Sequence, residues 1–327
     1  MEYVDNTQKR NLIWIALLVI VATVIPFAIS SFWLRIVTGV LMWIGLAQSW
    51  NILAGYMGYV SFGHGAFFGL GAYVTAIAMS LGVPFIISAL IAGAFTAAFA
   101  AVIGYPTLRL QGAYFAIATW AFAEAIRQIV LVLPFTGGAY GMRLPAMLNE
   151  NFFYYMMLLT IIGTVAIAYY LMHKAKFGLK VKAIREEETA ANVLGLDVTR
   201  IKISVFALSA FFPGILGGIY AYWITYIHPD SVLAPVIADQ MVVMTMLGGL
   251  GTIAGPIIGA VVLFMGNRLL WVFWGDTSFY LVLVGLAVAL VILFLPSGLV
   301  SLVPRLGKKD KPKVDDQPNS SVTEHTK

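Results

Sequence analysis

Few side chains capable of acid–base or ion chemistry interrupt the long apolar runs of this sequence. Glu124 and Arg127 lie three residues apart, the spacing of an ion pair on one helix face, and charges within a membrane are costly unless paired. Asp239 lies near the start of a short apolar run, where it is either solvated at a membrane surface or, if deeper, a functional candidate. His64 stands between two glycines. These residues could contact an ion or a solute.

Catalytic and metal-binding patterns are absent from the sequence. The four histidines are not spaced as metal ligands and there is no cysteine. No Gly-x-x-x-x-Gly-Lys-Ser/Thr motif for ATP phosphates exists, and the Gly-x-Gly-x-x-Ala pattern at Gly249–Ala254 lies in an apolar run with no preceding strand. We therefore predict no catalytic residue, no metal and no cofactor in this chain. A membrane enzyme is disfavoured, and any ATP with its magnesium must bind a separate subunit.

The composition is that of a membrane protein. The chain has 327 residues, of which 61% are hydrophobic and 11% charged, and its mean hydropathy is +0.90. Soluble domains have about 25% charged residues. The pI near 9.3 does not indicate a nucleic-acid partner, because the basic residues gather in short blocks beside apolar runs. We expect lipid to surround the chain.

Ten apolar segments approach the roughly 20 residues that cross a bilayer as a helix. They are 12–30, 34–54, 65–82, 84–104, 112–133, 152–172, 203–223, 236–250, 254–273 and 278–295. The 236–250 segment is short, and the first follows Lys9-Arg10 and is long enough to be a retained span rather than a signal peptide. The runs are continuous rather than alternating, which favours helices over a barrel. We predict an all-α, polytopic transmembrane helical bundle of about 8–10 spans.

The basic residues predict the orientation. Sixteen of the twenty lie near the N-terminus, at Arg109, from Lys174 to Lys202, or from Arg305 onward, and the positive-inside rule puts all of these in the cytoplasm. Ten crossings then leave both termini cytoplasmic and the loop 134–151 outside. We expect a cytoplasmic N-terminus over 1–11, one membrane domain over 12–304, and a polar, disordered cytoplasmic tail over 305–327.

Glycines recur every fourth residue in three places. Gly251, Gly255 and Gly259 form one series, and Gly65–Gly69 and Gly214–Gly218 repeat the spacing. Small residues at this interval line one helix face and let backbones approach closely in lipid. They predict helix packing within the chain, with a surface that slides or docks on a partner membrane subunit as the alternative.

The densest charge lies in the loop of about residues 174–202. Ala183–Leu194 has the apolar spacing of a short amphipathic helix, and Gly195 follows it as a C-terminal stop. The segment is either a solvated connector or a helix that docks on a soluble cytoplasmic partner. The candidate docking residues are Ile184, Arg185, Glu186, Glu187, Glu188, Ala190, Ala191, Leu194, Gly195 and Leu196.

Two glycine-rich stretches are candidates for a translocation pathway. Around His64, glycines permit a broken helix of the kind that forms binding sites in transporters, although a tight cytoplasmic turn capped by His64 fits as well. The stretch Gly137–Gly141 either makes turns or faces the mouth of a pathway. The candidate pathway residues are Ser61, Phe62, Gly63, His64, Phe67, Gly137, Gly138 and Asp239.

The charged loop resembles the coupling loop of LivM-type permeases of ABC importers. It reads FGLKVKAIREEETAANVLGLDVTRIK from Phe177 to Lys202. The importer signature, EAA then three residues and Gly, appears in a degenerate form over Thr189–Gly195, with Glu188 one place before the expected Glu. The proline present further on in many importers is absent. These departures fit the branched-chain amino-acid subgroup better than the maltose-like one.

Five further blocks are similar to the same family, in order and at its spacing. They are NILAGYMGYVSFGHGAFFGLGAYVTA (Asn51–Ala76), PTLRLQGAYFAIATWAFAEAIRQIV (Pro106–Val130), TGGAYG (Thr136–Gly141), MLGGLGTIAGPIIGA (Met246–Ala260) and FLPSGLVSL (Phe294–Leu302). Each block is modest alone, but together they cover about residues 10–305. The His-Gly-Ala-Phe-Phe form and the TGG loop favour LivM over its partner LivH.

The resemblance implies a transmembrane permease subunit of an ATP-driven importer in a bacterial or archaeal plasma membrane. Its partners would be two ABC ATP-binding subunits, a paralogous LivH-like permease and an extracytoplasmic substrate-binding protein. The expected substrates are branched-chain amino acids, with urea or short amides as the alternative within the family. A stand-alone secondary transporter or channel is the competing class, but the spans offer a thin set of ionisable groups for coupling.

Overall fold

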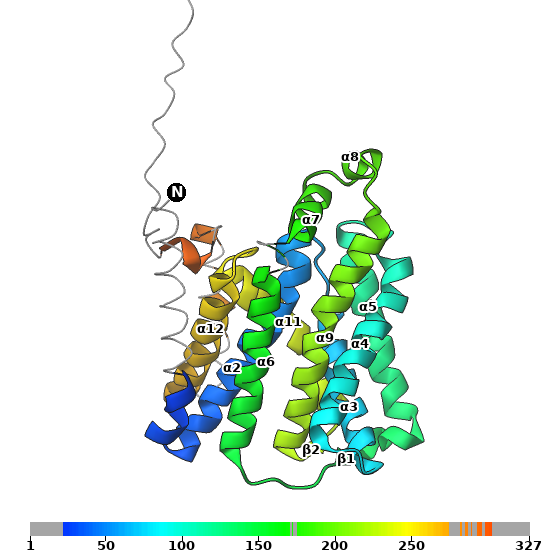
Figure 1. The fold of residues 1–327 in the computed structure, drawn as a ribbon. Coiled ribbons are helices and arrows are strands. Elements are labelled where there is room, and N and C mark those ends of the chain that lie inside the picture. Colours follow the sequence, from blue (N-terminus) through cyan, green and yellow to red (C-terminus); the bar gives the residue numbers. More distant parts are fainter. Residues whose placement is uncertain are drawn as a thin grey trace, which may run out of the picture.

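The long apolar runs form helices, which satisfy the backbone without water. The computed structural model describes residues 22–170, 172, 175–274, 282, 285–286, 289, 293–295 and 298–302 (Figure 1). Its helices are α2 Ser31–Met57, α3 His64–Ser80, α4 Phe85–Thr107, α5 Ala113–Val132, α6 Glu150–Tyr169, α7 Lys176–Glu186, α8 Glu188–Val193, α9 Val198–Ile224, α10 Pro229–Val232, α11 Pro235–Gly248 and α12 Ala254–Trp274. The 3₁₀ turns η1 Pro134–Thr136, η2 Gly138–Tyr140 and η4 Leu299–Leu302, and the strands β1 Met142–Arg143 and β2 Tyr226–Ile227, complete the described elements.

The predicted class, an all-α polytopic bundle, is confirmed. Within the described ranges, six helical segments are long and apolar enough to cross a membrane: α2, α4, α5, α6, α9, and Pro229–Gly248, which unites α10 and α11. Eight of the ten predicted segments coincide with α2, α3, α4, α5, α6, α9, α11 and α12. Of the remaining two segments, residues 22–28 are helical, whereas 12–21 and most of 278–295 lie outside the described residues.

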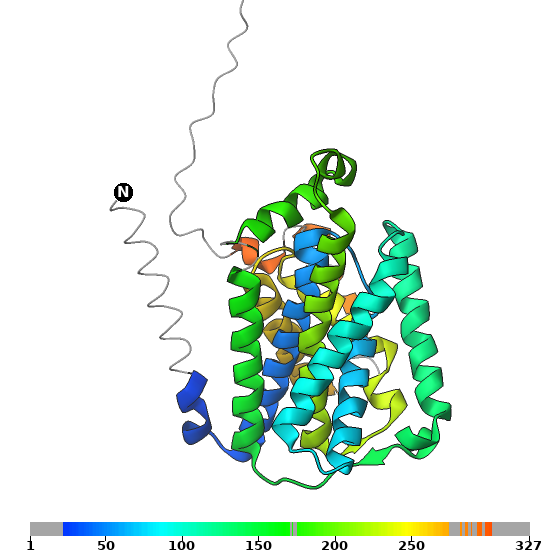
Figure 2. The ribbon, with the colours of Figure 1, turned by 45° about the vertical axis from the view of Figure 1, so that its right-hand side comes forward.

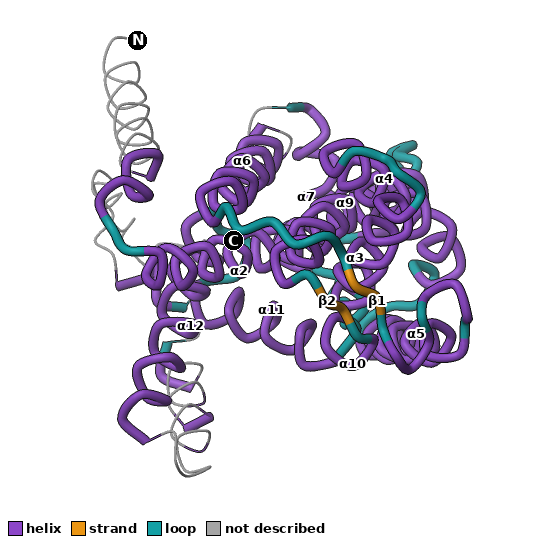
Figure 3. Tube along the Cα trace, turned by 90° about the horizontal axis from the view of Figure 1, so that it is seen from below, coloured by secondary structure: helices purple, strands orange, loops and turns teal. Residues whose placement is uncertain are grey.

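The bundle has two chemically different ends. The α7–α8 segment (residues 176–193) lies across one end, and the antiparallel pair β1–β2 lies at the other (Figure 1). Seen from the β1–β2 end, the strands lie beside α3, α10 and α5 (Figure 3). The glycine-rich loop 134–141 is therefore on the opposite side of the bundle from the charged segment, as the predicted topology requires.

The centre of the bundle is α9. It packs along α4, α3 and α2, and its glycines bring the backbones together: a Cβ on Gly217 would lie 1.9 Å from the Phe68 carbonyl oxygen, and one on Gly71 would lie 2.1 Å from that of Gly214. By contrast, α5 forms one edge of the bundle (Figure 2). Its span has the smallest buried share of the six, so much of its surface is left for lipid or another chain.

The glycines of the 251–259 series contact this same chain. A Cβ on Gly255 would lie 2.1 Å from the Gly249 carbonyl oxygen, and one on Gly259 would lie 1.8 Å from that of Met244. Gly251 has a φ of +73°, in the left-handed region where a side chain is strained. These contacts seat the start of α12 on the end of α11, which is what packing within the chain would produce.

The prediction of one helix over Ala183–Leu194 was wrong, because α7 ends at Glu186 and α8 begins at Glu188. Glu187 between them is extended, with φ −156° and ψ 106°, and its side chain accepts a hydrogen bond from the Thr189 backbone N–H. The bend allows Ile184 and Ala191 to be buried against the bundle together. Gly195 does follow the second helix, with φ +82°.

Candidate functional site

The chain between α2 and α3 begins at the surface, at Gly58 and Val60, and then turns into the bundle. Residues 58–63 (the interior break) form no regular helix, yet Ser61 is fully buried. Its carbonyl accepts a hydrogen bond of 2.7 Å from Trp50 Nε1, and Trp50 lies seven residues before the end of α2, or roughly 10 Å along the helix at 1.5 Å per residue. The backbone thus re-enters the bundle before α3 starts.

His64 begins α3 in an enclosed, mostly aromatic site. Its Nε2 lies 3.1 Å from Ser209 Oγ, and Ser209 donates its own proton to the Phe206 carbonyl, so Ser209 accepts from Nε2–H. The rings of Phe67 and Phe206 pack beside the imidazole. Nδ1 is left without a hydrogen-bond partner within the described residues. His64 is therefore a fully buried group and not an open ligand.

A second short helix begins at the same depth as α3. A Cβ on Gly65 would lie 3.2 Å from the Ala238 backbone nitrogen, so the first turns of α3 and α11 touch. Asp239 follows directly, on the exposed face of α11 with Val236 and Met246. The structure brings Asp239 and the start of α3 to one level, and Asp239 is directed away from the bundle.

The turn after α11 is bound to α2 by one amide side chain. Asn51 Nδ2 donates to the Thr252 carbonyl at 2.8 Å, and Asn51 Oδ1 accepts from the Gly251 N–H at 2.8 Å. Both polar ends of a fully buried amide are therefore satisfied. The contact fixes the Gly251 turn against the last turns of α2.

Arg185 connects the α7–α8 segment to that same place. Its Nη1 donates to the Gly55 carbonyl at 2.6 Å, in the last turn of α2. Gly58, the C-cap of α2, has a φ of +86° and lies against the aliphatic part of Arg185. A guanidinium beside the exposed carbonyls of a helix C-terminus is favourably placed with respect to the helix dipole.

Glu188 makes the second connection between this segment and the bundle. Lys202 Nζ donates to its Oε1 at 2.6 Å, and Tyr59 Oη donates to its Oε2 at 2.8 Å. Lys202 is only 3% exposed and also donates to the Leu108 carbonyl at 3.0 Å. Burial and the neighbouring carboxylate raise the pKa of Tyr59, so the phenol remains a donor throughout the physiological pH range.

The outward surface of the α7–α8 segment consists of the residues that do not pack against the bundle. Ile184 and Ala191 are buried, Leu196 is half-buried, and Arg185 and Glu188 hold the bundle. The apolar face predicted to enter a partner's groove is thus partly used within the chain. Arg185 is exposed although it binds the Gly55 carbonyl. The other exposed candidates are Glu186, Glu187, Ala190, Leu194 and Gly195, and the neighbouring Val193, which the sequence reasoning did not single out, is 84% exposed.

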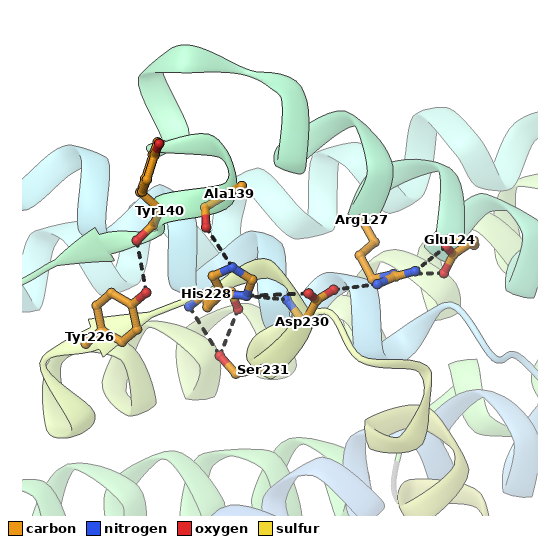
Figure 4. A network of polar contacts seen from close by, with 8 residues as sticks. All are labelled: Glu124, Arg127, Ala139, Tyr140, Tyr226, His228, Asp230 and Ser231. Carbon is orange, nitrogen blue, oxygen red and sulfur yellow. Dashed lines mark hydrogen bonds and ion pairs between the residues drawn. The ribbon is translucent and has the colours of Figure 1, made fainter.

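A polar network closes the β1–β2 end (Figure 4). The expected pair of Glu124 and Arg127 is present, at 2.6 Å, and Arg127 also pairs with Asp230 in α10. His228 Nε2 contacts the Ala139 carbonyl oxygen at 3.0 Å, while its Nδ1 accepts from the Asp230 backbone N–H, a pattern that fits the neutral ring. Gly137 and Gly138 lie in this loop, with φ of +74° and +52°, far from the interior break.

A separate cavity lies beside α2, α9 and α12. It has a volume of about 390 Å³ and is lined in part by Arg35, Trp43, Trp223, Phe264 and Arg268. None of the predicted pathway residues lines it. Arg35 stacks over the Trp223 ring and is 3.6 Å from Glu150.

These features define the class of the protein, which is a polytopic membrane transport component. They are the spanning helices, two shorter helices that begin inside the bundle, and a charged segment bound across one end. The chain belongs to the family of permease components of branched-chain amino acid transport systems, whose family model matches residues 32–295.

Known relatives agree with this membership. The chain is 29% identical to the high-affinity branched-chain amino acid transport system permease protein LivM of Salmonella typhimurium, over 93% of this chain and 78% of the relative. The Escherichia coli K12 protein of the same name gives the same figures. A ribose import permease, RbsC of Bacillus subtilis, is 28% identical over 41% of this chain. No solved structure matched.

Several residues that organise the site were missed by the sequence reasoning. Tyr59, Asn51 and Lys202 each find partners far away in the chain, up to 201 residues for Asn51 and Thr252. Their one local signal is polarity inside or beside an apolar run, which indicates a buried polar role but not the partner. Lys202 had been grouped with the cytoplasmic basic residues and not with the site.

Proposed function

We propose that this chain is the LivM-type permease subunit of an ATP-driven ABC importer that moves branched-chain amino acids across the plasma membrane. It is a transport subunit rather than an enzyme, and its ATP is hydrolysed by two separate ATP-binding subunits. A paralogous LivH-like permease and an external substrate-binding protein complete the complex. Family membership supports this, together with one structural observation: the α7–α8 segment presents an exposed tip while its inner face is fixed to the bundle.

In this proposal the α7–α8 end faces the cytoplasm. Seven basic residues of the described chain lie there: Arg109, Lys176, Lys180, Lys182, Arg185, Arg200 and Lys202. Four lie toward the β1–β2 end: Arg35, Arg127, Arg143 and Arg268. The excess of basic residues at the α7–α8 end supports placing that end in the cytoplasm by the positive-inside rule. In this proposal both termini are on the same side. The β1–β2 end, with Gly137 and Gly138, would then meet the substrate-binding protein. The domain boundaries 1–11, 12–304 and 305–327 belong to the same proposal.

The pathway in this proposal runs along the uncovered face of α5 and α11. Asp239 is exposed on a helix inside the membrane, where a carboxylate facing lipid is costly. Contact with a second permease chain or with water would remove that cost. The adjacent interior break at Ser61–His64 supplies a place where α3 can change its packing as access switches from one side to the other.

The proposed function is tested on the complex purified from its own membrane in gentle detergent. We expect ATP-binding subunits and a second permease to accompany the chain. After reconstitution with the external binding protein, uptake of radiolabelled leucine, isoleucine or valine should require ATP. Uptake of urea or acetamide in place of these amino acids would favour the alternative substrates. Uptake by the purified chain alone, driven by an ion gradient, would overturn the importer assignment.

The proposed subunit interface can be mapped by labelling a single cysteine, because the natural chain has none. Met246→Cys is on the exposed face of α11, and Ile86→Cys on α4 is a control of similar exposure. A maleimide carrying benzophenone should crosslink Met246→Cys to the LivH-like permease. The same reagent on Ile86→Cys should crosslink to lipid. Equal crosslinking of both variants to lipid alone would contradict the α11 interface.

A further inference from the structure

The α7–α8 segment is held to the bundle by two charged side chains that end at different places. Arg185 reaches the Gly55 carbonyl, and Gly251 lies beside its guanidinium, since a Cβ there would be 3.4 Å from Nη1. Arg185 therefore spans the end of α2 and the turn between α11 and α12. The same turn is held to α2 by Asn51, so these three parts form one unit.

Glu188 is the centre of the other connection. Its carboxylate accepts hydrogen bonds from Lys202 in α9 and from Tyr59 in the interior break, and Gln111 Nε2 lies 3.4 Å from it. The Lys202 ammonium also lies 4.6 Å from the Tyr59 ring centroid, a cation–π contact. One carboxylate of α8 thus joins the α2–α3 connection, the α4–α5 connection and the first turns of α9.

The Glu188 connection is stiff for an electrostatic reason. Lys202 is almost completely buried, and its described partners are Glu188, the Leu108 carbonyl and the Tyr59 ring. Removing the carboxylate would leave a buried ammonium without a counter-charge, which is far more costly than losing an exposed ion pair. When α8 moves, Lys202 and Tyr59 are therefore expected to move with it and to keep their hydrogen bonds to Glu188.

Tyr59 connects the Glu188 contact to the interior of the bundle through the chain itself. It precedes Ser61 by two residues, Ser61 is held by Trp50, and His64 follows as the first residue of α3. A shift of Tyr59 must therefore alter the path of residues 60–63 or the start of α3. Arg185 acts on the residues just before, Gly55 and Gly58. Both connections converge on the interior break from its α2 side.

We propose that Glu188 and Arg185 are positioning residues that transmit movement of the α7–α8 segment to the interior break, and that they are not docking residues. Docking is left to the exposed tip. This inference rests on the proposed importer function and assigns the inner and outer faces of one segment to different tasks. Lys202 and Tyr59 are the receiving residues of the Glu188 connection.

The test separates assembly from coupling in the reconstituted complex. Glu188→Lys should keep the ATP-binding subunits and their ATP hydrolysis, while leucine taken up per ATP hydrolysed falls by about tenfold, within the range seen for coupling mutations. Adding Lys202→Glu restores the opposite charges and should recover part of the uptake. Lys182→Glu is the matched control, because Lys182 is exposed on α7, is not one of the candidate docking residues and makes no ion pair within the described residues; its coupling should equal the wild type.

A milder variant covers the case in which Glu188→Lys does not fold. Tyr59→Phe keeps the ring against Lys202 and removes only the hydrogen bond to Glu188, so it should lower uptake per ATP without changing assembly. Loss of the ATP-binding subunits in Glu188→Lys but not in Lys182→Glu would make Glu188 a docking residue and overturn the inference. Normal coupling in both Glu188→Lys and Tyr59→Phe would also overturn it. Absence of the ATP-binding subunits from the wild type would instead refute the importer function.

Discussion

Aspartate in place of both Val193 and Leu194 is expected to release the ATP-binding subunits from the complex. These side chains are 84% and 80% exposed at the end of α8, and they are the large apolar pair at the tip. If they enter a partner groove, placing two carboxylates there should weaken binding about 100-fold, or about 3 kcal/mol, as hot-spot losses do. Uptake should fall with assembly.

The tip variant should leave the chain itself intact. Substitutions at exposed sites typically change the free energy of unfolding by less than about 0.5 kcal/mol. The measurement is co-purification of the ATP-binding subunits, read beside the thermal melting of the chain in detergent. Leu148→Asp is the control, since Leu148 is 99% exposed but lies near the β1–β2 end. Retention of the ATP-binding subunits by the tip variant would show that docking uses another surface.

Alanine at Gly217 is expected to destabilise the bundle strongly. Its Cβ would lie 1.9 Å from the Phe68 carbonyl oxygen and 3.1 Å from the Ala72 backbone nitrogen, and backbone atoms of α3 cannot rotate out of the way. The α3–α9 contact would have to open, at a cost of about 3 kcal/mol or more, the upper part of the range for overpacked cores. The same movement would disturb His64, since Ser209 is also on α9.

The comparison for Gly217→Ala is Gly163→Ala on α6. A Cβ on Gly163 would find its nearest neighbour, a Phe212 ring carbon, at 4.0 Å, so there is room for it. Alanine there should stabilise the helix by up to about 1 kcal/mol. Thermal melting followed by size-exclusion chromatography in detergent measures both. Equal melting temperatures would contradict the close packing of α3 on α9.

The helices of this protein were predictable because each apolar run carries its own signal. A stretch such as Phe85–Thr107 has to be helical wherever it lies in a membrane. Even the stop at Gly195 follows from local chemistry. The break at Glu187 could not be predicted from local chemistry. It depends on Ile184 in α7 and Ala191 in α8 both packing against the bundle. Local periodicity treats them as one face of one helix.

The candidate site was predictable only as separate stretches. The sequence singled out Glu188, Arg185 and His64 individually, but Glu188 meets Tyr59 across 129 residues and Arg185 meets Gly55 across 130. Nothing local distinguishes a glutamate that faces solvent from one that faces a buried lysine. Glu124 and Arg127 were recognised as a pair because three residues separate them; Asp230, 103 residues from Arg127, was not.

The interior break also constrains how the chain is assembled during synthesis. Within this stretch the Phe62 backbone N–H donates to Thr119 in α5, and His64, the next residue but one, pairs with Ser209 in α9. When α3 leaves the ribosome, α9 has not yet been made. The backbone bond from Phe62 therefore needs α5, and the side-chain bond of His64 needs α9. The start of α3 acquires its full set of contacts only after α9 has been made.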